Sequence, residues 1–326
     1  MSSLVSRASS ALRLLRRAPR RLAKLRRRLE KRRRHAARRT AKVLRRRHRV
    51  VRRSIQGRQR DNWRLRVERR RAAVARRSVG QLGLVVRGGP FAGLCYVPGS
   101  ERVLDLPSKL LGAYERELHP WIEELVDAEF EQVINVGSGD GYYAVGLARR
   151  MPEIEVIAFD SDGDRRELSE AVARANGVAG RLSVRGSCGP QELEALDIGP
   201  GTLLLVDCEG CEADLLRPDL LSGLAGCTIL VELHEFVERG ISVRILARFS
   251  ETHSATRVSS TPRRVREYPS LSFLGPLDRR IALSEYRPER MEWVLLRPLA
   301  ETVSAPGPGR AHRRPDTPST LSRTPR

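Results

Sequence analysis

The chain has 326 residues and a formal net charge of +22, and this charge is unevenly distributed. Residues 1–80 hold 32 Lys and Arg against three acids, a net charge of +29, whereas residues 81–326 hold 29 basic and 36 acidic residues. The basicity therefore belongs to an N-terminal arm, which excludes a uniformly basic globule, and five cysteines are too few for a disulfide framework.

Hydropathy argues against a membrane or secreted protein. No uncharged apolar run reaches the ~18–20 residues that a membrane helix needs. A secretory signal needs an apolar stretch of roughly 7–15 residues, and Arg13, Arg16 and Arg17 interrupt the only candidate near the N-terminus. We therefore expect a cytoplasmic protein in a reducing setting.

The arm, residues 1–80, carries Arg clusters that repel one another, so we expect it to be disordered or only partly helical in free solution. Leucines from Leu15 to Leu29 share one helical stripe. Contact with a polyanion, either nucleic acid or an anionic membrane surface, would relieve the repulsion. The alternative is a solvated tail that only keeps the protein soluble.

The composition from Gln81 onward is globular, and strands alternate with helices. Gly83–Val97 predicts one or two short strands, and Ser108–Val126 predicts one amphipathic helix. Further strands are expected at Gln132–Val136, Glu155–Asp160, Leu182–Arg185, Leu203–Asp207, Thr228–Leu233, Ile281–Glu285 and Glu292–Leu296. Further helices are expected at Tyr143–Arg150, Arg165–Asn176, Gln191–Leu196, Ala213–Leu216 and Ile241–Phe249. This order predicts a doubly wound, mostly parallel sheet over residues 81–300, followed by a disordered tail over residues 301–326.

A Gly-rich turn follows the strand that ends at Val136. Gly137 and Gly139 allow the backbone to turn sharply and to approach a ligand, and Gly141 allows the next helix to start close to the sheet. Asp160 ends the following strand, where a carboxylate can accept hydrogen bonds from ribose hydroxyls.

Binding of a dinucleotide follows the same logic, but the glycine spacing differs. The dinucleotide fingerprint is G-x-G-x-x-G, whereas Gly137-x-Gly139-x-Gly141 is one residue shorter. Asp140 lies inside the turn, where its charge would repel a pyrophosphate but tolerate a cationic sulfonium. The remaining alternative is a tight turn in an inert α/β domain.

These residues resemble a known family. Val133–Tyr143 looks like motif I of class I methyltransferases, and Asp207-Cys208-Glu209-Gly210-Cys211-Glu212 resembles the Asp-x-Glu-Gly-x-Glu motif of FkbM-type methyltransferases. Glu232-Leu233-His234 resembles the Glu-x-His segment of that family. The resemblance covers roughly residues 81–300 and implies a Rossmann-like, seven-stranded methyltransferase domain with S-adenosylmethionine as donor. It also implies O-methylation of a hydroxyl on a sugar, glycan or natural product.

The predicted cofactor-binding set combines the turn with the ends of the neighbouring strands. Its members are Asn135, Gly137, Ser138, Gly139, Gly141, Tyr142, Asp160, Ser187 and Asp207. Asn135 stands where the family usually has an acid.

We assign His234 as the general base that takes the hydroxyl proton, because histidine most often fills this role near neutral pH. Asp207 is its orienting or cofactor-side carboxylate. The alternative for His234 is a strand-end histidine that satisfies loop carbonyls.

A metal site is not favoured. Asp207, Glu209, Glu232 and His234 offer ligands for Mg²⁺, but hydrogen bonds to the backbone are the more ordinary role for Glu209 and Glu232. Cys208 and Cys211 lack a second pair at zinc-ligand spacing, and we interpret both as packing residues.

The sequence is also compatible with two other functions. One is an RNA methyltransferase that the basic arm tethers to its substrate, although the arm has a single aromatic residue for base stacking, Trp63. The other is a non-catalytic polyanion-binding protein with a methyltransferase-like domain.

Overall fold

The structure is a computed structural model that describes residues 65–299. The chain divides into two compact units, Met1–Arg69 and Arg70–Arg326, and the first is described only over residues 65–69, which are helical. The predictions for residues 1–64 and for the tail lie outside the described residues. Within the part that is described, no helix combines the length and the apolar character that a membrane crossing requires.

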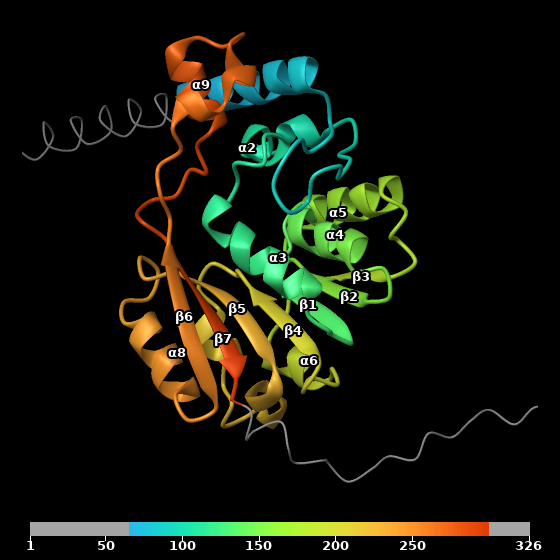
Figure 1. Cartoon of the computed structure of the whole chain (residues 1–326), viewed down its shortest axis with the longest axis vertical. Coiled ribbons are helices and arrows are strands. Elements are labelled where there is room, and N and C mark those ends of the chain that lie inside the picture. Colours follow the sequence, from blue (N-terminus) through green and yellow to red (C-terminus); the bar gives the residue numbers. More distant parts are fainter. Residues whose placement is uncertain (1–64, 300–326) are drawn as a thin grey trace, which may run out of the picture. The chain divides into compact units, whose positions relative to one another are not determined.

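The second unit is built on one seven-stranded sheet with the order β3-β2-β1-β4-β5-β7-β6 (Figure 1). Strands β1 to β5 pair in parallel, and β7 pairs antiparallel with both β5 and β6. The strands are β1 (Gln132–Val136), β2 (Glu155–Phe159), β3 (Leu182–Arg185), β4 (Thr202–Val206), β5 (Thr228–Leu233), β6 (His253–Ser259) and β7 (Glu292–Pro298). The predicted Rossmann-like, doubly wound, seven-stranded sheet is confirmed.

Helices cover both faces of the sheet (Figure 1). On one face, apolar side chains of α3, α4 and α5 pack against alternate residues of β1, β2 and β4, and on the other face α7 and α8 do the same. The α-helices are α2 (Leu106–Leu110), α3 (His119–Asp127), α4 (Tyr142–Arg150), α5 (Gly163–Ala175), α6 (Pro190–Glu194), α7 (Glu212–Leu215), α8 (Ile241–Phe249) and α9 (Pro276–Ala282). Successive residues of each strand therefore pack on opposite faces of the sheet, as the period of two in a β-strand requires.

A third, smaller apolar cluster joins the start of this unit to α9. Residues 70–82 are helical, and Val74 packs there with Leu271, Leu274 and Leu283. The predicted division of the chain at residue 80 falls inside this helix.

The single helix predicted over residues 108–126 is wrong. Its N-terminal part belongs to α2, and Gly112 follows with φ +63°, the left-handed conformation that commonly ends a helix. A β-carbon on Gly112 would lie 2.2 Å from the carbonyl carbon of Gly88, so the two backbone segments meet closely here. The chain becomes helical again only at Arg116–Leu118 and then in α3.

Three further expectations about strands need correction. Residues 281–285 are not a strand, because Ala282 and Leu283 complete α9 and its small apolar cluster. β6 was not among the expected strands, because its mostly exposed residues on the sheet edge show no apolar alternation. Gly83–Val97 forms only one isolated bridge, between Val85 and Cys95.

Candidate active site

The carboxyl ends of the parallel strands meet at one edge of the sheet, because their registers are aligned. Val136 of β1 lies beside Phe159 of β2 and Val206 of β4, so the residues that follow these strands are neighbours. A cavity of about 730 Å³ opens at this edge, and a second cavity of about 450 Å³ shares Gly137 and Asp207 with it. Ligands of doubly wound sheets bind at this edge.

The Gly-rich turn has the backbone geometry that its sequence predicts. Gly137 has φ +83°, and a β-carbon there would lie 1.6 Å from the carbonyl oxygen of Asp207. Asp160 accepts a hydrogen bond from Gly139 N at 2.7 Å and fixes the turn against β2. At Gly141, a β-carbon would lie 2.7 Å from Ser169 Oγ, which explains the close packing of α4 on α5. Glycine is therefore required at both ends of the turn.

The structure brings most of the predicted cofactor residues to these cavities. The larger cavity is lined by Gly137, Ser138, Gly139 and Tyr142, the smaller one by Asp160 and Ser187, and both by Gly137 and Asp207. Two predicted residues line neither cavity. Gly141 directly precedes α4, and Asn135 is buried within β1, where its Oδ1 has no hydrogen-bond partner among residues 65–299.

Two buried hydroxyl groups at the larger cavity fit a polar ligand. Ser138 Oγ and Tyr142 OH have no hydrogen-bond partner within the described part of the chain, and both residues line the cavity. A buried polar atom without a partner costs roughly 1–3 kcal/mol, so a ligand that bonds these oxygens would recover free energy. The close-packed glycines beside them leave space for that ligand.

Asp140 does not present a free charge, which corrects one sequence argument. Its carboxylate accepts hydrogen bonds from Lys109 Nζ at 2.7 Å and from Tyr96 OH at 2.9 Å. Burial lowers the pKa of Lys109, but the charges of Asp105 and Asp140 outweigh it and raise the pKa above its usual value. Asp140 therefore anchors a buried lysine, and repulsion of pyrophosphate by Asp140 no longer separates the two cofactor classes.

His234 directly follows β5 and lies at the floor of the larger cavity. Its Nδ1 lies 2.6 Å from Glu212 Oε1, and its Nε2 lies 3.6 Å from Asp207 Oδ1. Burial raises the pKa of Glu212, but the hydrogen bond with His234 outweighs it and lowers that pKa. An ionised carboxylate only accepts, so Nδ1 carries the proton in neutral His234 and Nε2 offers its lone pair. The carboxylate that orients His234 is thus Glu212, while Asp207 flanks Nε2.

The charges around the cavity determine the pKa values of His234 and Asp207. Burial lowers the pKa of His234, but the Glu212 hydrogen bond and the charge of Asp207 outweigh burial and raise it. The pKa of Asp207 is raised to about 6 by burial and by the charge of Glu115, against the positive charges of His234 and Arg287. Because 42% of the Asp207 side chain is exposed, solvent screens this shift until a ligand excludes the water.

Arg287 organises three acids beside this floor, and sequence reasoning missed it. It pairs with Glu115 at 2.5 Å, with Glu285 at 2.9 Å and with Glu232. Burial and the charges of Asp207 and Glu115 raise the pKa of Glu232, and Arg287 opposes this rise. No local motif marks Arg287, which lies 172 residues from Glu115 in the chain.

Three of the four predicted metal donors lie together. Atoms of Asp207, Glu232 and His234 are within 4.8 Å of one another, and Glu209 is not part of the group. Within it, the Arg287 guanidinium already pairs with Glu232. Arg287 therefore already supplies the positive charge that a divalent cation would bring to Glu232.

Cys208 and Cys211 form a disulfide, which corrects their interpretation as packing residues alone. Their Cα atoms lie 5.6 Å apart, a separation that disulfides favour, because the chain turns into α7 between them. Both cysteines and Cys188 line the smaller cavity.

Comparison with known sequences finds one short similarity. No protein-family model matches the chain. A segment of 69 residues is 39% identical to a 16S rRNA (adenine(1408)-N(1))-methyltransferase from Streptoalloteichus tenebrarius and covers 19% of this chain and 32% of that protein. The chain thus matches about a third of the length of that relative.

Solved structures similar to this chain include several methyltransferases. The O-methyltransferase TomG from Streptomyces achromogenes is 14% identical with a TM-score of 0.37, over 54% of this chain and 77% of TomG. The C-terminal domain of precorrin-6Y C5,15-methyltransferase from Rhodobacter capsulatus is 15% identical with a TM-score of 0.39, over 56% and 89%. A putative O-methyltransferase from Klebsiella pneumoniae is 14% identical with a TM-score of 0.37, over 71% and 90%.

Proposed function

We propose that this protein is an S-adenosylmethionine-dependent methyltransferase that methylates a hydroxyl oxygen. The observation that carries the proposal is the Glu212–His234 pair, which holds a histidine with an unprotonated Nε2 at the cavity beside the Gly-rich turn. The Asp207–Glu212 and Glu232–His234 segments meet at this cavity, which supports membership of the FkbM type.

The residues that would hold the cofactor are divided between the two cavities beside the Gly-rich turn. Ser138 and Tyr142 offer unpartnered hydroxyls to its polar groups, and Asp160 offers a carboxylate for ribose hydroxyls. S-adenosylmethionine would supply a methyl group on a positively charged sulfur, which leaves as a neutral thioether. Asp207, which lines both cavities, places a negative charge near that sulfonium.

His234 removes the proton that the reaction releases. As the acceptor oxygen forms its bond to the methyl carbon, Nε2 takes the hydroxyl proton, and the resulting imidazolium is stabilised by Glu212 and Asp207. Glu212 fixes the ring because it is fully buried and hydrogen-bonded to Nδ1. The site thus combines a fixed base with a position for the electrophile, and positioning supplies much of the rate.

Cofactor binding tests the first part of the proposal. Isothermal titration of the full-length chain should show binding of S-adenosylmethionine, and Asp160→Ala should weaken it by roughly 1–3 kcal/mol, since a hydrogen bond to a charged group is lost. NADH that binds tighter than S-adenosylmethionine would refute the assignment.

Transfer of a radiolabelled methyl group to a panel of sugars, glycans and phenols tests the base. His234→Gln should lower turnover about 10²–10⁴-fold at unchanged cofactor affinity. His253→Gln is the matched control, because His253 is equally buried but bonds the Cys227 carbonyl away from the cavity. Equal turnover of the two variants would remove His234 from the mechanism. Activity that EDTA abolishes and Mg²⁺ restores would instead assign Asp207, Glu232 and His234 to a metal.

An RNA methyltransferase is the second candidate, favoured by the short match to an rRNA methyltransferase and by the basic arm. The same radiolabel assay with 16S rRNA as acceptor distinguishes the two. Incorporation into rRNA but not into the small-molecule panel would favour this candidate. Absence of S-adenosylmethionine binding would favour a non-catalytic protein that binds polyanions.

A further inference from the structure

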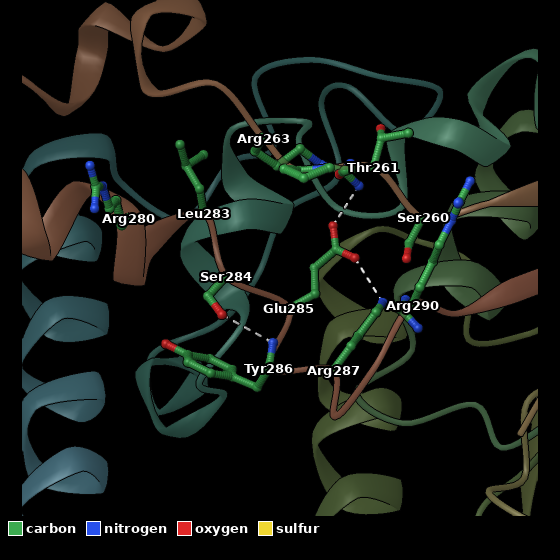
Figure 2. A pocket seen from close by; sticks show the side chains of 11 residues that line it. Ser260, Thr261, Arg263, Arg280, Leu283, Ser284, Glu285, Tyr286, Arg287 and Arg290 are labelled. Carbon is green, nitrogen blue, oxygen red and sulfur yellow. Dashed lines mark hydrogen bonds and ion pairs between the residues drawn. The ribbon is translucent and has the colours of Figure 1, made fainter. Parts of the chain in front are cut away.

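A further cavity of about 700 Å³ is bordered by the segment that carries Arg287 (Figure 2). It is lined by residues 260–263 after β6, by the end of α9, and by residues 284–287. Glu285, Tyr286 and Arg287 line both this cavity and the candidate active site, so the two spaces are neighbours divided by this short segment. We call this second space the arginine cavity.

The arginine cavity has an excess of positive charge. Its lining holds one acid, Glu285, and four arginines, Arg263, Arg280, Arg287 and Arg290. Arg263 is neutralised by Glu117 and Glu285, and Arg287 by the acids described above.

Two of these arginines are unpaired. Arg280 and Arg290 are exposed, and within residues 65–299 neither has a hydrogen bond or an ion pair. Figure 2 shows them on opposite sides of the cavity, with Glu285 and Arg263 between them. Each unpaired guanidinium group can bind a phosphate or a carboxylate by paired hydrogen bonds.

The remaining lining suits a ligand that has both an anionic and an uncharged part. Ser260 Oγ accepts from Met291 N, and Ser284 Oγ accepts from Tyr286 N, so each hydroxyl keeps its own hydrogen for donation. Leu283 and Pro262 add apolar surface. The volume exceeds that of a single inorganic ion and lies in the range of cavities that hold small organic ligands, about 300–1,000 Å³.

We propose that the arginine cavity binds a phosphate group of the methyl acceptor. The proposal rests on the function proposed above, and it narrows the acceptor to a phosphate-bearing molecule. The phosphate would bind one of the two unpaired guanidinium groups, Arg280 or Arg290, and the hydroxyl to be methylated would extend past Tyr286 towards His234. The acids of the active-site floor repel phosphate, whereas the unpaired arginines attract it. The phosphate end of the acceptor therefore enters the arginine cavity, and the hydroxyl end enters the active site.

The test compares two double variants of the full-length chain. Arg280→Gln with Arg290→Gln removes the proposed phosphate contacts, and Arg76→Gln with Arg239→Gln removes two exposed arginines outside the cavity that make no hydrogen bond or close ion pair among the described residues. Because both double variants keep the basic arm and lose the same charge, any difference between them belongs to the cavity. The probes are inorganic phosphate, ribose 5-phosphate and a ten-nucleotide single-stranded RNA.

The cavity variant should bind ribose 5-phosphate or the RNA about tenfold or more weakly than the control variant does. A loss confined to ribose 5-phosphate assigns a small phosphorylated acceptor, and a loss confined to RNA assigns a polynucleotide. A tenfold loss for inorganic phosphate alone, or equal affinities of the two variants for all three probes, would overturn the proposal. S-adenosylmethionine affinity should be unchanged in both variants. Failure of the wild-type chain to bind S-adenosylmethionine would refute the proposed function and leave phosphate binding a separate result.

Discussion

Removal of the Arg287 side-chain charge should destabilise the fold strongly and in a pH-dependent way. Arg287→Met leaves Glu115 and Glu232 without their counter-ion, whereas Glu285 keeps Arg263 at 2.6 Å. Breaking a buried ion pair by removing one partner costs about 3–5 kcal/mol, because a buried charge stays uncompensated.

The sign of the pH dependence follows from proton uptake. A buried carboxyl that has lost its cation takes up a proton, so its folded-state pKa rises above the unfolded value and stability falls as pH rises. Each pH unit above the unfolded pKa of about 4.3 costs about 1.4 kcal/mol per proton. For one proton the destabilisation is therefore roughly 2 kcal/mol at pH 6 and roughly 5 kcal/mol at pH 8.

Urea unfolding followed by circular dichroism at pH 6 and pH 8 measures this difference. Arg297→Met is the control, because Arg297 pairs with Glu124 on the surface at 2.6 Å, and such pairs contribute about 0–1 kcal/mol. Glu232→Gln in the Arg287→Met background should reduce the pH dependence, because Glu232 is the carboxyl whose raised pKa Arg287 opposes. A loss for Arg287→Met that matches the control, or that does not change between the two pH values, would refute the reasoning.

Three further predictions concern the turn, an ion pair and the arm. Gly137→Ala should abolish binding of S-adenosylmethionine in a titration, because its β-carbon would lie 1.6 Å from a backbone oxygen, whereas Gly177→Ala has a similar positive φ with no atom nearby and should bind normally. Burial raises the pKa of Glu117, but hydrogen bonds, chiefly from Arg263, lower it to about 2. Ionised Glu117 therefore contributes roughly 3 kcal/mol to the free energy of unfolding above pH 4.5, and this contribution is lost as pH falls towards 2. The unfolding curves of Glu117→Gln and of the wild type should converge in acid. A chain without residues 1–64 should elute from heparin at lower salt than the full-length chain, with affinity falling steeply with salt; equal elution would show that this segment does not bind polyanions.

The sequence by itself determined the strands of the parallel sheet and the residues at their ends. Gly137, Asp160, Asp207 and His234 could be placed because each follows a short apolar strand, and parallel strands in register bring such residues to one edge. The glycine spacing likewise indicated a backbone close to a ligand, and Gly137 has the positive φ that this requires.

Only the tertiary structure decided which partners these residues meet. The hydrogen bond that His234 donates to Glu212 depends on how α7 packs beside β5. The ion pair of Arg287 with Glu115 joins two residues that lie 172 positions apart in the chain. The helix predicted from residue 108 is broken because Gly112 meets the backbone at Gly88. Local patterns encode the faces of helices and strands, whereas long-range ion pairs and backbone contacts depend on which segments the folded chain brings together.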